Sequence, residues 1–223
     1  MQIQKELFEQ SGWKALNRIG TFAEMHHIFK QNFSDLNTLL MQIKKNEDGE
    51  NAWLHLSQYI FNFLASSFSL CEHCRKMMAF YKGTELYKEY EKKTHETFKN
   101  NLCAFIHKFR NYQTHYQIEF AYSDTQKNTV VFLSENLLKD KSQWNAKSRE
   151  FILENGDELN VAQIFSDYLM LTDKFYIWLY KELMEYHKHD MKERDALIKK
   201  MNFDSVCLSS TITDALNGKK VSG

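Results

Sequence analysis

The chain has 223 residues, 43% of them hydrophobic and 14% aromatic, which is enough to bury a sizeable core. Its 29 Lys and Arg residues balance 29 Asp and Glu residues, which argues against a protein that coats nucleic acid over its whole surface. There is no proline and there are only seven glycines, so few residues interrupt long helices.

Cysteine spacing and hydropathy bear on the compartment. The four cysteines show no regular spacing, and a chain of this size and apolar content can fold without stabilising disulfide bonds. The first residues lack a basic segment followed by an apolar run, so no signal peptide is visible. The most apolar stretch, Tyr59 to Leu70, is short and contains polar residues, which favours a buried helix. We expect a reduced, cytoplasmic protein with no membrane association.

Apolar residues recur at helical spacing through the first third of the chain. Residues 2–31 are predicted to form one or two helices, and Ser34 is expected to cap a further helix that ends near residue 43. The polar segment 44–50 reads as a loop. Residues 51–81 carry the strongest helical pattern in the sequence.

A break at Gly83-Thr84 precedes a second long helix, predicted from residue 85 to about 112, with Thr84 as its N-cap. Two long helices joined by a short turn should pack as an antiparallel hairpin.

After His115 the pattern becomes strand-like. Apolar residues alternate from Ile118 to Tyr122, and Thr129 to Leu133 is rich in β-branched and aromatic residues. The polar segment 123–128 separates them. This pattern predicts a small β-hairpin around residues 117–133.

Helical patterns then return to residue 202. The predicted helices cover 134–138, 142–153, about 158–188 and about 190–202, with a turn at residues 155–157. With no internal repeat or linker in view, residues 1–204 are expected to form a single all-α domain with the small β-hairpin. Residues 205–223 are small and polar, and we expect a mobile tail.

The segment from Arg110 to His115, R-N-Y-Q-T-H, contains side chains suited to binding phosphate and transferring protons. A guanidinium can hold a phosphate through two hydrogen bonds, and an imidazole can transfer a proton near neutral pH. Asn111 could orient either group. These groups suit cleavage of RNA by its own 2′-hydroxyl, which leaves a 2′,3′-cyclic phosphate and a 5′-hydroxyl, without a metal or other cofactor.

The pattern R-N-x-x-x-H at the end of a long helix resembles the signature of the HEPN superfamily (higher eukaryotes and prokaryotes nucleotide-binding domains), many of whose members are ribonucleases. The resemblance implies a HEPN-like helical bundle, RNA as substrate, and a defence or toxin-type role. Arg110 and His115 would be catalytic, with Asn111 supporting. Some HEPN toxins are silenced by nucleotide transfer onto a tyrosine two residues after the histidine, where this chain has Gln117. Regulation by that route is therefore not expected.

Substrate contacts are expected to extend along the same helix. We take Lys108, His107 and Tyr116 as candidate substrate-binding residues, because cations and an aromatic ring there could meet RNA phosphates and bases. A solvated helix face is the competing interpretation of these side chains.

The spacing of the motif bears on the oligomeric state. Residues five apart on a regular helix point about 140° away from each other. One site per chain therefore needs the helix to end between Arg110 and His115. The resemblance offers an alternative, in which the motifs of two protomers meet in one cleft. We therefore expect a two-fold symmetric homodimer.

Other interpretations stay open. Arg110 could be an ordinary solvated or ion-paired helix residue, and His115 could cap the helix end. The rival functions are a non-catalytic helical binding or regulatory protein and a nucleotide-binding partner of a nucleotidyltransferase.

Two further clusters contain residue types that can bind a metal ion. Cys71-Glu72-His73-Cys74 resembles half a zinc site that Cys103 and His107 could complete, but both cysteine groups fall within predicted helices, so core packing is favoured. His187 and His189 are interpreted as a solvated helix end.

Overall fold

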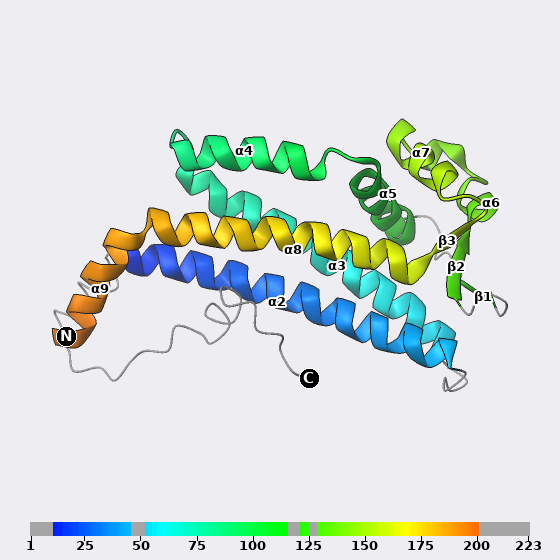
Figure 1. Ribbon diagram of the computed structural model, residues 1–223, viewed down its shortest axis with the longest axis horizontal. Helices are drawn as coiled ribbons and strands as arrows, with labels where there is room; N and C mark the ends of the chain where they lie inside the picture. Colours follow the sequence, from blue (N-terminus) through cyan, green and yellow to red (C-terminus); the bar gives the residue numbers. More distant parts are fainter. Residues whose placement is uncertain (1–10, 46–51, 116–120, 125–128, 201–223) are drawn as a thin grey trace. The chain divides into compact units, whose positions relative to one another are not determined.

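The computed structural model describes residues 11–45, 52–115, 121–124 and 129–200 (Figure 1). Helices dominate and a small antiparallel sheet accompanies them, which confirms the predicted fold class. The chain divides into two compact units: unit 1 comprises Met1–His27, Leu70–Lys93 and Lys174–Gly223, and unit 2 comprises Ile28–Ser69 and Thr94–Asp173. The predicted tail, 205–223, lies outside the described residues.

The first described helix, α2 (Ser11–Lys44), is unbroken, so the predicted start of a new helix at Ser34 is wrong. The carbonyl of Ser34 accepts a hydrogen bond from Thr38 Oγ1 at 2.9 Å, as an interior helical residue does. Leu36, two residues after Ser34, is fully buried. Burial of this apolar stripe stabilises the helix through a position that would otherwise suit a cap.

The strongest predicted helix is confirmed as α3 (Ala52–Met78), followed by the 3-10 turn η1 (Ala79–Tyr81). Gly83 has a φ of 88°, a conformation that glycine adopts without steric cost. Thr84 Oγ1 then accepts a hydrogen bond from the Tyr87 backbone N–H at 3.2 Å, which confirms Thr84 as the N-cap of α4 (Glu85–Phe98).

The second long helix is in fact two helices, α4 and α5 (Asn101–His115). Asn100 Oδ1 accepts a hydrogen bond from the backbone N–H of Cys103 at 2.8 Å, which is the geometry of an N-cap. The predicted single helix from 85 to 112 is therefore wrong at this point.

The hairpin is confirmed as β1 (Tyr122–Asp124) and β2 (Thr129–Leu133), with Tyr122 opposite Val131. Residues 118–120 and 125–128 lie outside the described residues. The sequence does not reveal a third strand, β3 (Glu158–Asn160), which pairs antiparallel with β2 and puts Leu159 opposite Phe132.

Three short helical segments lie between β2 and β3 along the chain. They are α6 (Ser134–Leu137), the 3-10 turn η2 (Lys141–Gln143) and α7 (Ala146–Glu154). The predicted turn at 155–157 is confirmed, with Gly156 at a φ of 78°. Helix α8 (Val161–Tyr186) starts three residues later than predicted because β3 comes first, and α9 (Lys188–Lys200) follows. None of the described helices is both long and apolar enough to cross a membrane.

Aromatic packing holds α5 in unit 2. Figure 1 shows α5 beside α7, and Ser148 Oγ donates a hydrogen bond to the Ala104 carbonyl at 3.0 Å. Phe105 and Phe109 are fully buried, and their rings stack 5.6 and 6.4 Å from that of Trp144. Each buried ring of this size contributes about 1.5 to 3 kcal/mol. The side of α5 that carries these rings is thereby fixed in the core.

Candidate functional site

The candidate site lies on the last two turns of α5, on the side that the core does not use. Phe105, Phe109 and Tyr112 are buried and recur at helical spacing. Arg110 and Asn111 are half-buried and Thr114 is exposed. The amphipathic pattern of α5 thus turns polar residues of the motif away from the core.

Arg110 is held by two contacts, one with an aromatic ring and one with an amide. Its guanidinium carbon lies 4.5 Å from the centre of the Phe68 ring, and Nη1 donates a hydrogen bond to Asn111 Oδ1 at 3.1 Å. Within the part of the chain that the structure describes, no Asp or Glu forms an ion pair with it. The guanidinium is thus oriented by an aromatic face and an amide, and its charge stays available to an anion.

His115 belongs to the same unbroken helix as Arg110. Five residues on a regular helix separate the two positions by about 140°. The helix end that would let both act in one chain does not fall between them. The His115 side chain and all of Tyr116 lie outside what the structure describes.

His107 shares a side of α5 with Arg110, because residues three apart are neighbours on a helix. It is exposed, and its ring centre lies 6.5 Å from that of Phe68. Partial burial lowers the pKa of His107 from 6.5, and the charges of Lys108 and Arg110 lower it further. The imidazole is therefore neutral near pH 7 and able to accept a proton. Lys108 is half-buried.

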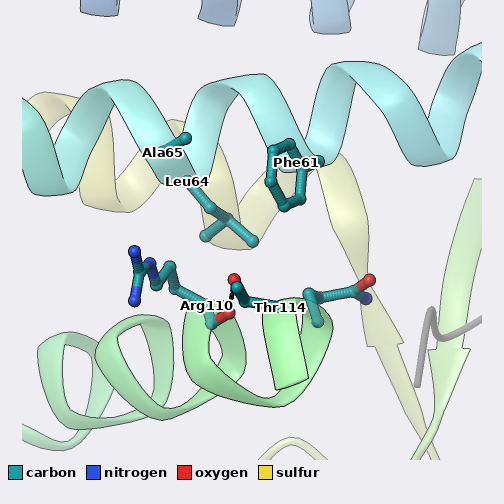
Figure 2. A pocket seen from close by; sticks show the side chains of 6 residues that line it. Phe61, Leu64, Ala65, Arg110 and Thr114 are labelled. Carbon is teal, nitrogen blue, oxygen red and sulfur yellow. Dashed lines mark hydrogen bonds between the residues drawn. The ribbon is translucent and has the colours of Figure 1, made fainter. Parts of the chain in front are cut away.

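A shallow pocket lies between α3 and α5, within unit 2. Figure 2 shows Phe61 and Leu64 extending from α3 toward α5, and Arg110 and Thr114 extending from α5 toward α3. Ala65 and Gln113 complete the lining. The cavity volume is only about 20 Å³, whereas ligand pockets usually span roughly 300 to 1,000 Å³. The pocket can therefore hold a group about the size of a water molecule and cannot enclose a nucleotide.

Gln113 contributes a buried polar group to this lining. The residue is 7% exposed, and its Nε2 has no hydrogen-bond partner among the described residues. Burying an amide donor without a partner costs free energy, roughly 1 to 3 kcal/mol. Thr114 Oγ1, by contrast, donates to the Arg110 carbonyl at 2.8 Å.

Phe68 is a site residue that the sequence alone does not mark. It follows the apolar stripe of α3, which predicts a core position, yet 37% of it is exposed. Phe61, Leu64, Ala65 and Phe68 recur at spacings of three and four, so they line one side of α3. The signal was a second apolar stripe beside the buried one.

The cysteine cluster makes core contacts in unit 1. Cys71 Sγ lies 3.4 Å from Tyr176 Oη, and Cys74 Sγ lies 4.0 Å from Tyr90 Oη. Burial raises the pKa of the Cys74 thiol, which disfavours the thiolate that zinc requires. These contacts support the interpretation of Cys74 as a core residue.

The interpretation of His187 as a solvated residue is wrong. It is 6% exposed, and its Nδ1–H donates to Asp190 Oδ2 at 2.7 Å. A second hydrogen bond of 2.9 Å joins its Nε2 to Tyr81 Oη. His189 is exposed as expected. Among the described residues, His189, Asp190 and Glu193 are the one set of three potential metal ligands whose nitrogen and oxygen atoms lie within 4.8 Å of one another.

No protein-family model, curated protein or solved structure matches this chain.

Proposed function

We propose that the protein is a metal-independent endoribonuclease with a HEPN-like fold, acting on RNA in the cytoplasm in a defence or toxin-type role. One observation carries the proposal. The guanidinium of Arg110 is held by Phe68 and Asn111, and no carboxylate of the described residues neutralises it. A half-buried arginine kept in this state is suited to an anionic ligand, and the motif in which it stands suits RNA.

The proposed reaction is a transfer within the RNA itself. The 2′-oxygen attacks the adjacent phosphorus, the bond from phosphorus to the 5′-oxygen breaks, and the products are a 2′,3′-cyclic phosphate and a 5′-hydroxyl. Arg110 stabilises the charge that builds on the phosphate oxygens. His115 transfers a proton as general acid or base.

The proposed active form is a homodimer. Arg110 and His115 are five residues apart on one helix, about 140° around its axis. A two-fold axis near the end of α5 would let Arg110 of one chain act with His115 of the other.

The test is incubation of purified protein with end-labelled RNA in EDTA. Wild type should cleave and leave cyclic-phosphate ends, whereas His115→Ala and Arg110→Gln should not. His95→Ala is the matched control, because His95 is an exposed histidine on α4 whose Nε2 lies 2.9 Å from Lys99 Nζ. Equal cleavage by all four proteins would identify a contaminant and defeat the proposal.

A second candidate is a helical binding protein that keeps the fold without catalysis. The continuity of α5 through His115 favours it, because a monomer would then keep Arg110 and His115 apart. Under this alternative, RNA binding depends on Arg110, no product forms, and the protein sediments as a monomer at concentrations where binding is complete.

A further inference from the structure

A histidine other than that of the motif lies next to Arg110 in its own chain. His107 and Arg110 are three residues apart on α5, so they occupy neighbouring positions on one side of the helix. Both approach the same ring, that of Phe68 on α3. The guanidinium carbon is 4.5 Å from the ring centre, and the imidazole centre is 6.5 Å from it. All three residues belong to unit 2.

The state of this histidine suits a reacting group. His107 is exposed, and neither ring nitrogen makes a hydrogen bond to another described residue. The charged groups that act on it are Lys108 and Arg110 of its own helix, while α3 presents the uncharged Phe68. With its pKa lowered by partial burial and these two cations, the imidazole is a neutral acceptor at neutral pH.

We propose that His107 is the proton acceptor that works beside Arg110 in the same chain, and that Phe68 is a positioning residue for both. The proposal rests on the proposed ribonuclease activity and deepens it. A single phosphate diester of RNA would lie against the guanidinium, with the adjacent 2′-hydroxyl toward His107.

The step balances with two imidazoles. His107 takes the proton from the 2′-hydroxyl as the 2′-oxygen forms its bond to phosphorus. The bond from phosphorus to the 5′-oxygen breaks, and the leaving oxygen receives a proton from the imidazolium of His115 in the proposed dimer. One proton is taken and one is given, so no oxidant, reductant or further reactant is required.

Cleavage kinetics test the catalytic part. His107→Gln keeps a polar side chain of similar size and cannot take up the proton. Its kcat should fall roughly 100-fold or more, with the Kd for RNA changed less than about threefold. The kcat of Phe68→Leu should fall about tenfold. The kcat of His95→Gln should equal that of wild type. The wild-type rate should fall in acid with a midpoint below pH 6.5, because the lowered pKa keeps His107 in its accepting form down to that range. A kcat of His107→Gln within threefold of wild type would overturn the proposal.

A binding measurement separates this proposal from the ribonuclease activity. The ring-proton NMR signal of His107, assigned by its loss in His107→Gln, is followed during titration with inorganic phosphate. A nearby phosphate should raise the pKa of His107, and Arg110→Gln should abolish the response. A His107 signal that ignores phosphate would overturn the site. If wild type binds phosphate at His107 but cleaves no RNA, the ribonuclease proposal and the proton-transfer role of His107 both fall.

Discussion

Two histidine clusters of this chain differ in what surrounds the imidazole. In unit 1, His187 is buried, and Tyr81 and Asp190 engage both of its ring nitrogens. In unit 2, His107 is exposed beside Arg110, and an aromatic face is what the fold presents to it. Both ring nitrogens of His187 take part in hydrogen bonds, whereas no described residue forms a hydrogen bond with the His107 ring. The environment of a histidine, more than its neighbours in sequence, decides between these roles.

The surroundings of the two histidines also differ in how closely they pack. A Cβ atom added at Gly12 would lie 2.5 Å from the carbonyl oxygen of Asp190, so α2 and α9 approach so closely there that a glycine is required. Ser11 also donates a hydrogen bond that helps to lower the pKa of Asp190, after the larger effect of His187. Around His107, α3 supplies the Phe68 ring, and the histidine remains exposed. The first cluster is closely packed and the second is open to solvent.

The largest expected effect separates activity from stability in unit 2. Arg110→Gln should reduce RNA cleavage by about 100-fold or more, because it removes the cation that would stabilise the phosphate. Its free energy of unfolding, measured with urea, should change by less than about 1 kcal/mol. A variant that loses stability in step with activity would place Arg110 among the structural residues and erase the contrast.

The opposite pattern is expected in unit 1. His187→Ala should lower the free energy of unfolding by about 2 to 4 kcal/mol, because it leaves the Tyr81 hydroxyl and the Asp190 carboxylate without their shared partner. Urea denaturation measures this loss. Cleavage per folded molecule should stay at the wild-type level, and His189→Ala, an exposed neighbour, serves as the control.

Gly12→Ala should cost about 1 to 3 kcal/mol, because the new methyl group meets backbone that must shift. Thermal unfolding monitored by circular dichroism is the measurement. Gly83→Ala is an informative comparison, since nothing lies within 4 Å of its added Cβ and its cost would come from a φ of 88° alone. An unchanged melting temperature for Gly12→Ala would show that the close approach is not maintained.

Tyr81→Phe should cost about 1 kcal/mol, the worth of one buried hydrogen bond. Tyr186→Phe is the matched control, because Tyr186 is half exposed and packs edge-on against the Tyr81 ring. Equal losses from both variants would mean that the hydroxyl of Tyr81 adds nothing to the cluster.

The smallest effect concerns pH. The hydrogen bond from His187 holds the pKa of Asp190 below its usual 3.8, so the stability it contributes is present above that pH and is lost as the pH falls through the lowered value. The stability difference between wild type and Asp190→Asn should therefore be constant near neutral pH and shrink in acid. A difference that grows in acid would contradict the assignment.

Local signals explain which elements the sequence predicts. Gly83, a turn-forming residue, directly precedes Thr84, an N-cap residue. The sequence therefore predicts the break between α3 and α4. The break before α5 is marked in sequence by Asn100 and not by glycine or proline, and asparagine is common in loops and caps. Ser34 shows the reverse case, a good cap residue carried through a helix by the burial of its neighbours.

The candidate site is predictable in its motif and less so in its surroundings. Arg110 and Asn111 are readable because they are adjacent in sequence and on one amphipathic helix. Phe68 comes from a different helix, 42 positions earlier, and apolar periodicity marks it as core. His187 is misread because its partner Tyr81 is 106 positions away. Contacts between distant segments are the information that a one-dimensional pattern lacks.

The two units receive their last residues at different times during protein synthesis. Each boundary between the units falls inside a helix, in α2, α3, α4 or α8. Unit 2 has all of its residues once Asp173 has left the ribosome. Unit 1 contains the earliest residues, yet Phe22 waits for Tyr176 and Tyr180, whose rings lie 5.4 and 4.8 Å from it. The packing of Phe22 on these rings is therefore completed only after α8 has been made, although α2 is the first described helix of the chain.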